Sequence, residues 1–225
     1  MGDLWVFAYG SLMWRPGFSY LEVRRATLTG YRRCFCVYSV HHRGSPMRPG
    51  LVLGLDRGGV CRGLAFRVHS AQADATLKYL RAREQVTGAY RETTVPLLLD
   101  HEQFVEGLAY IAERAHPGYA GQMAVSQQAR LIRGACGLSG TNLDYLASTL
   151  RHLAALGIRE RELERVLQLA GPVFALGSEV ERAARIASLV SAVQRTPVGP
   201  ARKRRGDLRR FMHRQSVKPA WRPRT

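Results

Sequence analysis

One glutamate, Glu84, lies where a predicted helix carries its apolar residues. The segment SAQADATLKYLRAREQV has apolar residues at the spacing of one helix face, at Ala73, Leu77 and Leu80. Position 84 is the next member of this series. A carboxylate there loses hydration, so it is either paired with a cation or has the raised pKa of a proton-transfer group. The pattern fits both a general acid/base and a structural ion pair with Arg83 or Arg91.

A second candidate is the loop Tyr9-Gly10-Ser11-Leu12, which directly follows an apolar run. A glycine at the end of a strand lets a ligand approach the backbone closely and exposes N–H donors. The loop could therefore hold a carboxylate, and an ordinary turn is the alternative. Ser11 is not expected to be a catalytic nucleophile, because the sequence has no G-x-S-x-G elbow and no suitably spaced His and Asp partners.

Metal and redox chemistry are not favoured by the cysteine and histidine spacing. The chain has four cysteines, Cys34, Cys36, Cys61 and Cys136. They form neither the CxxC pairs of a zinc site nor the density of a disulfide scaffold, which indicates buried, reduced thiols. His41 and His42 are adjacent, and adjacent residues of an extended chain point to opposite faces, so they make a poor chelating pair.

The elements that position these candidates are predicted to be strands in the first half of the chain. Apolar or alternating runs predict strands at residues 4–8, 34–40, 51–55, 60–68, 93–99 and 104–111. Asp56-Arg57-Gly58-Gly59 predicts a hairpin turn between two of these strands, since glycine readily supplies the positive φ of tight turns. A helix is predicted from Ser70, as its N-cap, to Val86, with Gly88 as its C-terminal cap.

The second half is predicted to be helical. Helical spacing is present at residues 122–133, 142–155, 160–169 and 180–193, and Thr141 with Asp144 forms an N-cap pattern. This order of elements predicts an α+β domain with a small barrel or curled sheet and helices packed on its outside. We expect one domain over residues 1–195, followed by a linker and a basic, Pro/Arg-rich, poorly ordered tail over residues 196–225.

Composition and charge are those of a globular protein with a basic tail. Of 225 residues, 46% are hydrophobic and 23% charged, which excludes fibrous and disordered classes. No apolar run approaches the roughly 18 residues of a membrane span, and no signal peptide is recognisable, so a soluble, cytoplasmic protein is expected. Residues 200–225 carry ten Lys or Arg and one Asp, a net of +9 out of the +17 of the chain. Weak nucleic-acid binding by the tail is compatible with this charge, and the body need not bind nucleic acid.

Six ordered blocks of sequence resemble the ChaC family of glutathione-specific γ-glutamylcyclotransferases, over roughly residues 4–170. The blocks are LWVFAYGSLMWRPGF, HHRGSPMRPGLVLGLDRGG, GLAFRV, YLRAREQVTGAYRE, AYIAERAHPGYAG and SGTNLDYL. The order of six blocks is far more specific than any one of them. The resemblance implies the γ-glutamylcyclotransferase-like fold, a small closed β-barrel with flanking helices, which agrees with the elements predicted above.

The resemblance also implies roles for individual residues. It makes Glu84 the catalytic acid/base and the loop Tyr9-Gly10-Ser11-Leu12 the holder of the γ-glutamyl group. Tyr90 and Tyr119 would be pocket tyrosines, and Arg43 would meet a substrate carboxylate. The implied reaction is attack of the γ-glutamyl α-amine on its own γ-carbonyl, which releases 5-oxoproline and Cys-Gly from glutathione. No metal and no organic cofactor is implied.

Two alternatives to this function remain open from the sequence. The first is a cyclotransferase that acts on other γ-glutamyl amines. The second is a non-catalytic regulator, or a nucleic-acid binder that uses the basic tail. The oligomeric state also stays open at this point.

Overall fold

The structure is a computed structural model, and it describes residues 2–85 and 87–171. Its strands are β1 Leu4–Ala8, β2 Glu22–Ser39, β3 Gly50–Val68, β4 Tyr90–Leu99, β5 Phe104–Ala112, β6 Cys136–Gly137 and β7 Gly140–Thr141. Its α-helices are α1 Ala73–Glu84, α2 Val125–Gly134, α3 Asn142–Ala155 and α4 Arg161–Ala170. Three short 3₁₀ helices are η1 Ser11–Met13, η2 Ser70–Gln72 and η3 Asp100–Glu102.

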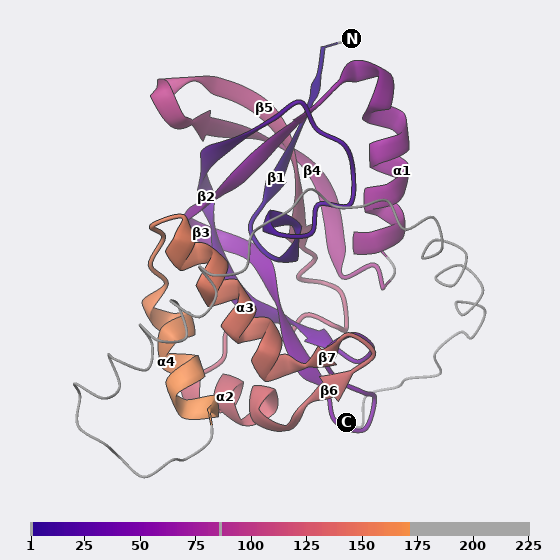
Figure 1. The fold of residues 1–225 in the computed structure, drawn as a ribbon. Coiled ribbons are helices and arrows are strands. Elements are labelled where there is room, and N and C mark those ends of the chain that lie inside the picture. The colour runs from indigo at the N-terminus through magenta and orange to yellow at the C-terminus, as the bar shows by residue number, and fades with distance from the viewer. Residues whose placement is uncertain (1, 86, 172–225) are drawn as a thin grey trace. The chain divides into compact units, whose positions relative to one another are not determined.

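Five strands form a closed barrel in the order β1-β3-β2-β4-β5, and β1 closes it by pairing with β5 in parallel (Figure 1). The other neighbours in this order pair antiparallel. Closure leaves few unpaired strand edges and gives the barrel an interior that side chains fill. The predicted fold class, an α+β protein built on a small closed barrel with flanking helices, is confirmed.

A long hairpin of β2 and β3 forms much of the barrel, and its turn is not where the sequence predicted it. The strands pair from Ser39 opposite Gly50 to Glu22 opposite Arg67, so the chain reverses in residues 40–49. The predicted turn at residues 56–59 lies inside β3 and is wrong. Gly58 and Gly59 do have positive φ angles, of 92° and 78°, but they form a register shift opposite β2 that bends the hairpin.

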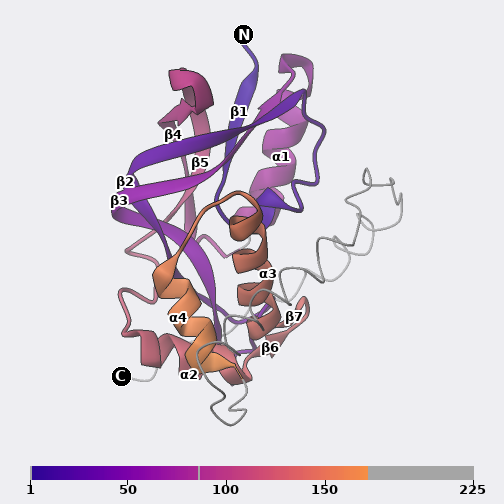
Figure 2. The ribbon, with the colours of Figure 1, turned by 60° about the vertical axis from the view of Figure 1, so that its left-hand side comes forward.

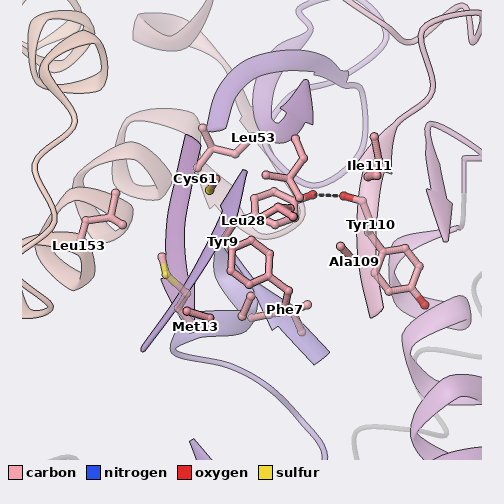
Figure 3. Packing of buried hydrophobic residues seen from close by; sticks show 14 of the residues in the cluster. Phe7, Tyr9, Met13, Leu28, Leu53, Cys61, Ala109, Tyr110, Ile111 and Leu153 are labelled. Carbon is pink, nitrogen blue, oxygen red and sulfur yellow. Dashed lines mark hydrogen bonds between the residues drawn. The ribbon is translucent and has the colours of Figure 1, made fainter. Parts of the chain in front are cut away.

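The interior of the barrel is an apolar core. Phe7 of β1, Leu28 of β2, Leu55 of β3 and Leu97 of β4 are fully or almost fully buried, and Tyr110 of β5 has 1% of its surface exposed. Figure 3 shows the ring of Tyr9 near that of Phe7, and the Tyr9 hydroxyl bonded to the carbonyl of Tyr110, whose own ring points away. Tyr9, which directly follows β1, is thus held in place, so the loop starts from a fixed point.

Helix α1 follows the barrel strand β3 and ends at Glu84. The predicted N-cap at Ser70 is wrong, because Ser70 begins the short helix η2, where His69 accepts from Ala71 N–H, and α1 itself begins after Gln72. Gly88 has a φ of +73° and donates to the Gln85 carbonyl, as expected after a helix end.

Helices α2, α3 and α4 form a separate group against the barrel, and α1 lies apart from it in both views (Figures 1 and 2). The predicted N-cap of α3 is confirmed, since the Thr141 hydroxyl accepts from Asp144 N–H at 3.0 Å. The Asn142 side chain then bonds both the N–H and the carbonyl of Leu51, at 2.6 and 2.7 Å. These bonds fix α3 to the start of β3.

Some predictions of the sequence lie outside the described residues. These are the helix at 180–193, the domain boundary at 195 and the basic tail at 196–225. None of the helices described in residues 2–85 and 87–171 is long and apolar enough to cross a membrane.

The four thiols are free, and three of them fit the predicted picture. Cys36 and Cys61 are buried and Cys34 is partly buried. Cys136 is exposed, so the expectation of a buried thiol is wrong there. It lies in the two-residue strand β6, a small hairpin that is too short to bury both of its faces.

Candidate active site

Glu84 occupies the last position of α1, on the face that the sequence predicted to be buried. Thr76 and Leu80 of the same face are buried, and Lys78 is exposed on another face. Of the Glu84 side chain, 19% is exposed. Burial raises the pKa of this carboxyl above its usual value, and the charge and hydrogen bond of Arg83 oppose that rise only in part. Glu84 is therefore a carboxylate with an incompletely compensated charge.

Arg83 is the ion-pair partner of Glu84, which was one of the two cations considered from the sequence. Its Nε lies 3.0 Å from Oε1 of Glu84. The other candidate, Arg91, pairs with Glu113 instead. The ion pair and the raised pKa thus coexist, so the structural and catalytic interpretations of Glu84 do not exclude each other.

The loop Tyr9-Gly10-Ser11-Leu12 reaches Glu84 through Arg83. Ser11 Oγ accepts a hydrogen bond from Nη2 of Arg83 at 3.0 Å. The backbone N–H groups of Gly10, Ser11 and Leu12 donate to no backbone carbonyl among the described residues, as is usual where a short helix begins. The loop therefore offers backbone donors close to the guanidinium that holds Glu84.

The charge of Glu84 raises the pKa of four tyrosines from four elements. They are Tyr9 of the loop, Tyr90 of β4, Tyr110 of β5 and Tyr145 of α3. Burial is the larger cause of the rise at each of these hydroxyls. All four are neutral at physiological pH, and the Tyr110 hydroxyl donates to Glu92 at 3.2 Å.

The hydroxyls of Tyr9 and Tyr90 both donate hydrogen bonds to backbone carbonyls. Tyr9 donates to the carbonyl of Tyr110 at 2.8 Å (Figure 3), and Tyr90 donates to the carbonyl of Leu53 at 2.8 Å. The Tyr9 carbonyl accepts from Nε of the buried Arg33 at 2.6 Å. These bonds fix both ends of the Tyr9 residue, which orients the loop that follows it.

Arg43, in the turn between β2 and β3, lies at the edge of this cluster. Its guanidinium carbon is 5.3 Å from the centre of the Tyr145 ring, and Nη1 donates to the Thr141 carbonyl at 3.1 Å. Partial burial lowers the pKa of Arg43, and the nearby charge of Arg15 contributes to the shift. The guanidinium of Arg43 keeps its charge at physiological pH.

Tyr119 lies in a different cluster from the other predicted site residues. Burial and the nearby Asp56 raise the pKa of its hydroxyl, and the guanidinium carbon of Arg114 is 5.9 Å from its ring centre. Asp56 is buried, with 3% of its side chain exposed, and Arg114 contacts it at 2.7 Å. The structure brings Glu84, the loop, Tyr90 and Arg43 together, and it places Tyr119 against Asp56.

A cavity of about 220 Å³ lies away from Glu84. Its walls come from β2, β3, the end of β4 and the turn between α3 and α4, and include Arg25, Arg62, Asp100 and Gly157. The carboxylate of Asp100, in the wall of this cavity, is paired with Arg24. None of the site residues predicted from the sequence lines this cavity. The Glu84 cluster, where the charge of a carboxylate is only partly compensated, is the better candidate for proton transfer.

Comparison with known proteins agrees with this geometry. The sequence model of the ChaC-like protein family matches residues 4–173. The chain belongs to this family. A glutathione-specific γ-glutamylcyclotransferase of Escherichia coli is 36% identical over 166 residues, which span 74% of this chain and 72% of that protein. Glutathione-specific γ-glutamylcyclotransferase 1 of mouse is 37% identical over 177 residues, 76% of this chain and 79% of the relative.

Among solved structures, a glutathione-specific γ-glutamylcyclotransferase from yeast matches this ChaC-like chain with a TM-score of 0.69. The alignment covers 76% of this chain and 96% of the yeast chain, at 22% identity. At this identity the match establishes a shared fold.

Two residues of the ChaC-like site were missed as site residues by reasoning from sequence. Tyr145 is 7% exposed, its hydroxyl accepts from Leu53 N–H at 3.4 Å, and a Cβ placed on Gly10 would lie 3.5 Å from it. Arg83 was considered only as an ion-pair partner, and its contact with the loop was not foreseen. The burial of Tyr145 could be predicted, because it lies on the same helix face as Leu146 and Leu153. Its position against Gly10 could not, because it depends on how α3 packs on the barrel.

Proposed function

We propose that this protein is a glutathione-specific γ-glutamylcyclotransferase in which Glu84 is the general acid/base. The observation that carries the proposal is a partly buried carboxylate with a raised pKa, joined through Arg83 to the loop at Tyr9–Leu12. The names of the E. coli and mouse relatives support glutathione as the substrate.

The reaction needs one group that first accepts and then donates a proton. Glu84 takes a proton from the α-ammonium of the γ-glutamyl residue, and the freed amine attacks its own γ-carbonyl. The new C–N bond closes a five-membered ring, the old amide C–N bond breaks, and Glu84 returns the proton to the departing amine of Cys-Gly. The products are 5-oxoproline and Cys-Gly. Because the nucleophile belongs to the substrate, holding it against the carbonyl supplies a large part of the rate increase.

The loop supplies donors for the negative charges of the substrate. Backbone N–H groups of Gly10, Ser11 and Leu12 would hold either the α-carboxylate or the oxyanion that develops on the γ-carbonyl. Tyr90 would form a wall of the same pocket. The buried Tyr9 fixes the start of the loop through its bonds to Tyr110 and Arg33.

Arg43 is proposed to bind the glycine carboxylate at the far end of glutathione. Its guanidinium lies beside the Tyr145 ring, at the edge of the cluster. A guanidinium forms charge-assisted hydrogen bonds with carboxylates. Tyr119 is proposed to act less directly, since it lies in the cluster of Asp56 and Arg114.

We further propose that the protein acts in the cytoplasm, on a small-molecule substrate and without a metal or organic cofactor. Among the described residues, no group of three or more His, Cys, Asp or Glu side chains is arranged to hold a metal ion. The basic tail at 196–225 is proposed to contribute at most weak, salt-dependent binding to nucleic acid.

The test is release of 5-oxoproline by the purified protein from millimolar glutathione, measured beside γ-glutamyl-alanine. Release from glutathione in clear preference is the expected result. Faster release from γ-glutamyl-alanine would favour a cyclotransferase on other γ-glutamyl compounds. No release from either substrate would favour a non-catalytic regulator or binding protein.

A further inference from the structure

A single guanidinium, that of Arg83, contacts both parts of the candidate active site. Nε lies 3.0 Å from Oε1 of Glu84, and Nη2 donates to Ser11 Oγ at 3.0 Å. Nη1 donates to the Tyr79 hydroxyl at 3.0 Å and to the carbonyl of Arg15 at 2.5 Å. All three guanidinium nitrogens thus contact a partner. Ser11 and Arg83 are 72 residues apart in the chain. Arg83 therefore ties the end of α1 to the loop after β1.

The charge of Glu84 has no second compensating cation among the described residues. The Glu84 charge raises the pKa of Tyr9, Tyr90, Tyr110 and Tyr145, and these hydroxyls are neutral at physiological pH. Among the described residues, Arg83 lowers the pKa of Glu84, against the larger effect of burial. Removing the guanidinium would leave a desolvated carboxyl that prefers its neutral form.

The two carboxylate oxygens of Glu84 also differ in their contacts. Oε1 is held by Arg83, and Oε2 has no hydrogen-bond or ion-pair partner among residues 2–85 and 87–171. A carboxylate that is anchored by one oxygen and open at the other is arranged to accept a proton at a fixed position. Such anchoring is what acid/base catalysis requires of the groups around the base.

We propose that Arg83 is a positioning residue of the cyclotransferase: its guanidinium fixes Glu84 against the Tyr9–Leu12 loop and keeps that carboxylate charged. This inference rests on the proposed function and deepens it. A lysine would supply the charge but not the planar fork that reaches Glu84 and Ser11 together. The electrostatic and positional contributions of Arg83 can therefore be separated by two variants, Arg83→Lys and Arg83→Met.

The first experiment is the pH dependence of kcat/KM and of the plateau kcat. For Arg83→Met, we expect the midpoint of the acidic limb to shift to higher pH by about one unit or more, because a cation within ~4 Å of Glu84 has been lost. We also expect the plateau kcat to fall by about tenfold or more, since a misplaced base is a poor one. For Arg83→Lys, the limb should stay near that of the wild type while the plateau still falls.

The matched control is Arg81→Met, on the same helix. Arg81 pairs with Glu92 rather than Glu84, and 53% of its side chain is exposed. This variant should keep both the limb and the plateau of the wild type. A loss in Arg81→Met equal to that in Arg83→Met would assign the effect to α1 stability and overturn the proposal.

His42 must be separated from Glu84 in these profiles, because histidine has an ordinary pKa of about 6.5 and the pKa of His42 is lowered from it. Burial and neighbouring charges, including that of Arg83, lower the pKa of His42, so removing Arg83 also changes this group. The shift of the acidic limb should therefore persist when both proteins carry His42→Asn. A shift that disappears in this background would belong to His42 and would contradict the proposal.

The second experiment does not depend on turnover, so it separates failure of this inference from failure of the proposed function. In protein labelled with ¹³C-glutamate, the Glu84 carboxyl resonance is identified by its absence from Glu84→Gln and followed with pH. The midpoint should rise in Arg83→Met and remain near the wild-type value in Arg83→Lys. Equal midpoints in wild type and Arg83→Met, or a full plateau kcat in Arg83→Lys, would overturn the inference.

Discussion

The clusters around Asp56 and Glu84 each combine a carboxylate, arginine and tyrosine, and they compensate the carboxylate to opposite extents. Asp56 accepts from Nε of Arg114 at 2.7 Å and contacts Arg32 at 3.4 Å, and its charge raises the pKa of Tyr119. Burial alone would raise the pKa of Asp56, but its hydrogen bonds, above all that from Arg114, lower it overall.

Glu84 has the reverse balance. Burial raises its pKa, and one arginine compensates its charge only in part. The same residue types thus give a compensated carboxylate at Asp56 and the proposed proton acceptor at Glu84. Asp56 has two arginine partners and Glu84 has one, which favours a structural role for the first and a catalytic role for the second.

The largest expected effect is the loss of turnover in Glu84→Gln. The amide keeps the volume of the side chain but cannot accept a proton, so kcat for glutathione should fall by at least about 100-fold. Glutathione binding should persist, and the thermal midpoint should stay within a few degrees of the wild type. Rates and melting curves taken on one preparation check this prediction. Retained turnover in a destabilised protein would make Glu84 an ion-pair residue only.

The opposite outcome is expected for Asp56→Asn. Removing the charge leaves Arg114 and Arg32 without their carboxylate, and the free energy of unfolding should fall by about 1–3 kcal/mol. Because Asn keeps the size and shape of the side chain beside Tyr119, kcat per folded molecule should remain within a few-fold of the wild type. Urea unfolding measures the stability. A large loss of kcat without loss of stability would move Asp56 and Tyr119 into the catalytic site.

A smaller effect is expected for Arg43→Ala. If Arg43 binds the glycine carboxylate equally in the ground and transition states, KM for glutathione should rise roughly fivefold, the equivalent of about 1 kcal/mol, with kcat little changed. A substrate without that carboxylate, such as glutathione amide, should show no such difference between wild type and variant. An unchanged KM for glutathione would place Arg43 outside the substrate pocket.

The two clusters should also respond to pH with opposite signs. The raised pKa of Glu84 means that its contribution to stability is complete below the ordinary glutamate value of about 4.3 and is lost as pH rises through the folded-state pKa. The lowered pKa of Asp56 means that its contribution is present above about 3.9 and is lost as pH falls through the folded-state pKa.

Relative to wild type, Glu84→Gln should therefore gain stability as pH rises from 4 to 8. The deficit of Asp56→Asn should shrink as pH falls towards 3. Unfolding midpoints of the three proteins across this range check both signs. Parallel curves for Glu84→Gln and wild type would show that Glu84 has no shifted pKa in the folded state.

The smallest effect is expected from the tail. Deleting residues 200–225 removes a net charge of +9 and should leave cyclotransferase turnover essentially unchanged. Any binding to nucleic acid should weaken steeply with salt and be lost with the deletion. A many-fold fall in turnover of a folded, truncated protein would mean that the tail completes the site.

Much of the fold could be predicted from the sequence because its local signals are strong. The strand at residues 4–8 and the helix at 142–155 have the predicted bounds, since an apolar run and a capped amphipathic segment are local features. The first half of β2 was missed. Arg24, Arg25, Arg32 and Arg33 interrupt its alternation, and the partners that let arginines remain in a strand, such as Asp100 and Glu160, are far away in the chain.

The candidate site shows the same division between local and long-range information. Glu84 was identifiable because a carboxylate in an apolar helix face is visible within twelve residues of helix. The bond from Arg83 to Ser11 and the docking of Tyr145 against Gly10 were not, because they join distant segments. The turn at residues 56–59 was wrongly predicted because two glycines with positive φ serve a bulge as well as a hairpin.

The comparison between the two carboxylates can be tested in one measurement. The rate of 5-oxoproline release from glutathione is determined per folded molecule for wild type, Glu84→Gln and Asp56→Asn. We predict that wild type and Asp56→Asn turn over at similar rates and that Glu84→Gln is slower by at least about 100-fold. Turnover by Glu84→Gln at the wild-type rate would contradict the assignment of Glu84 as the proton acceptor.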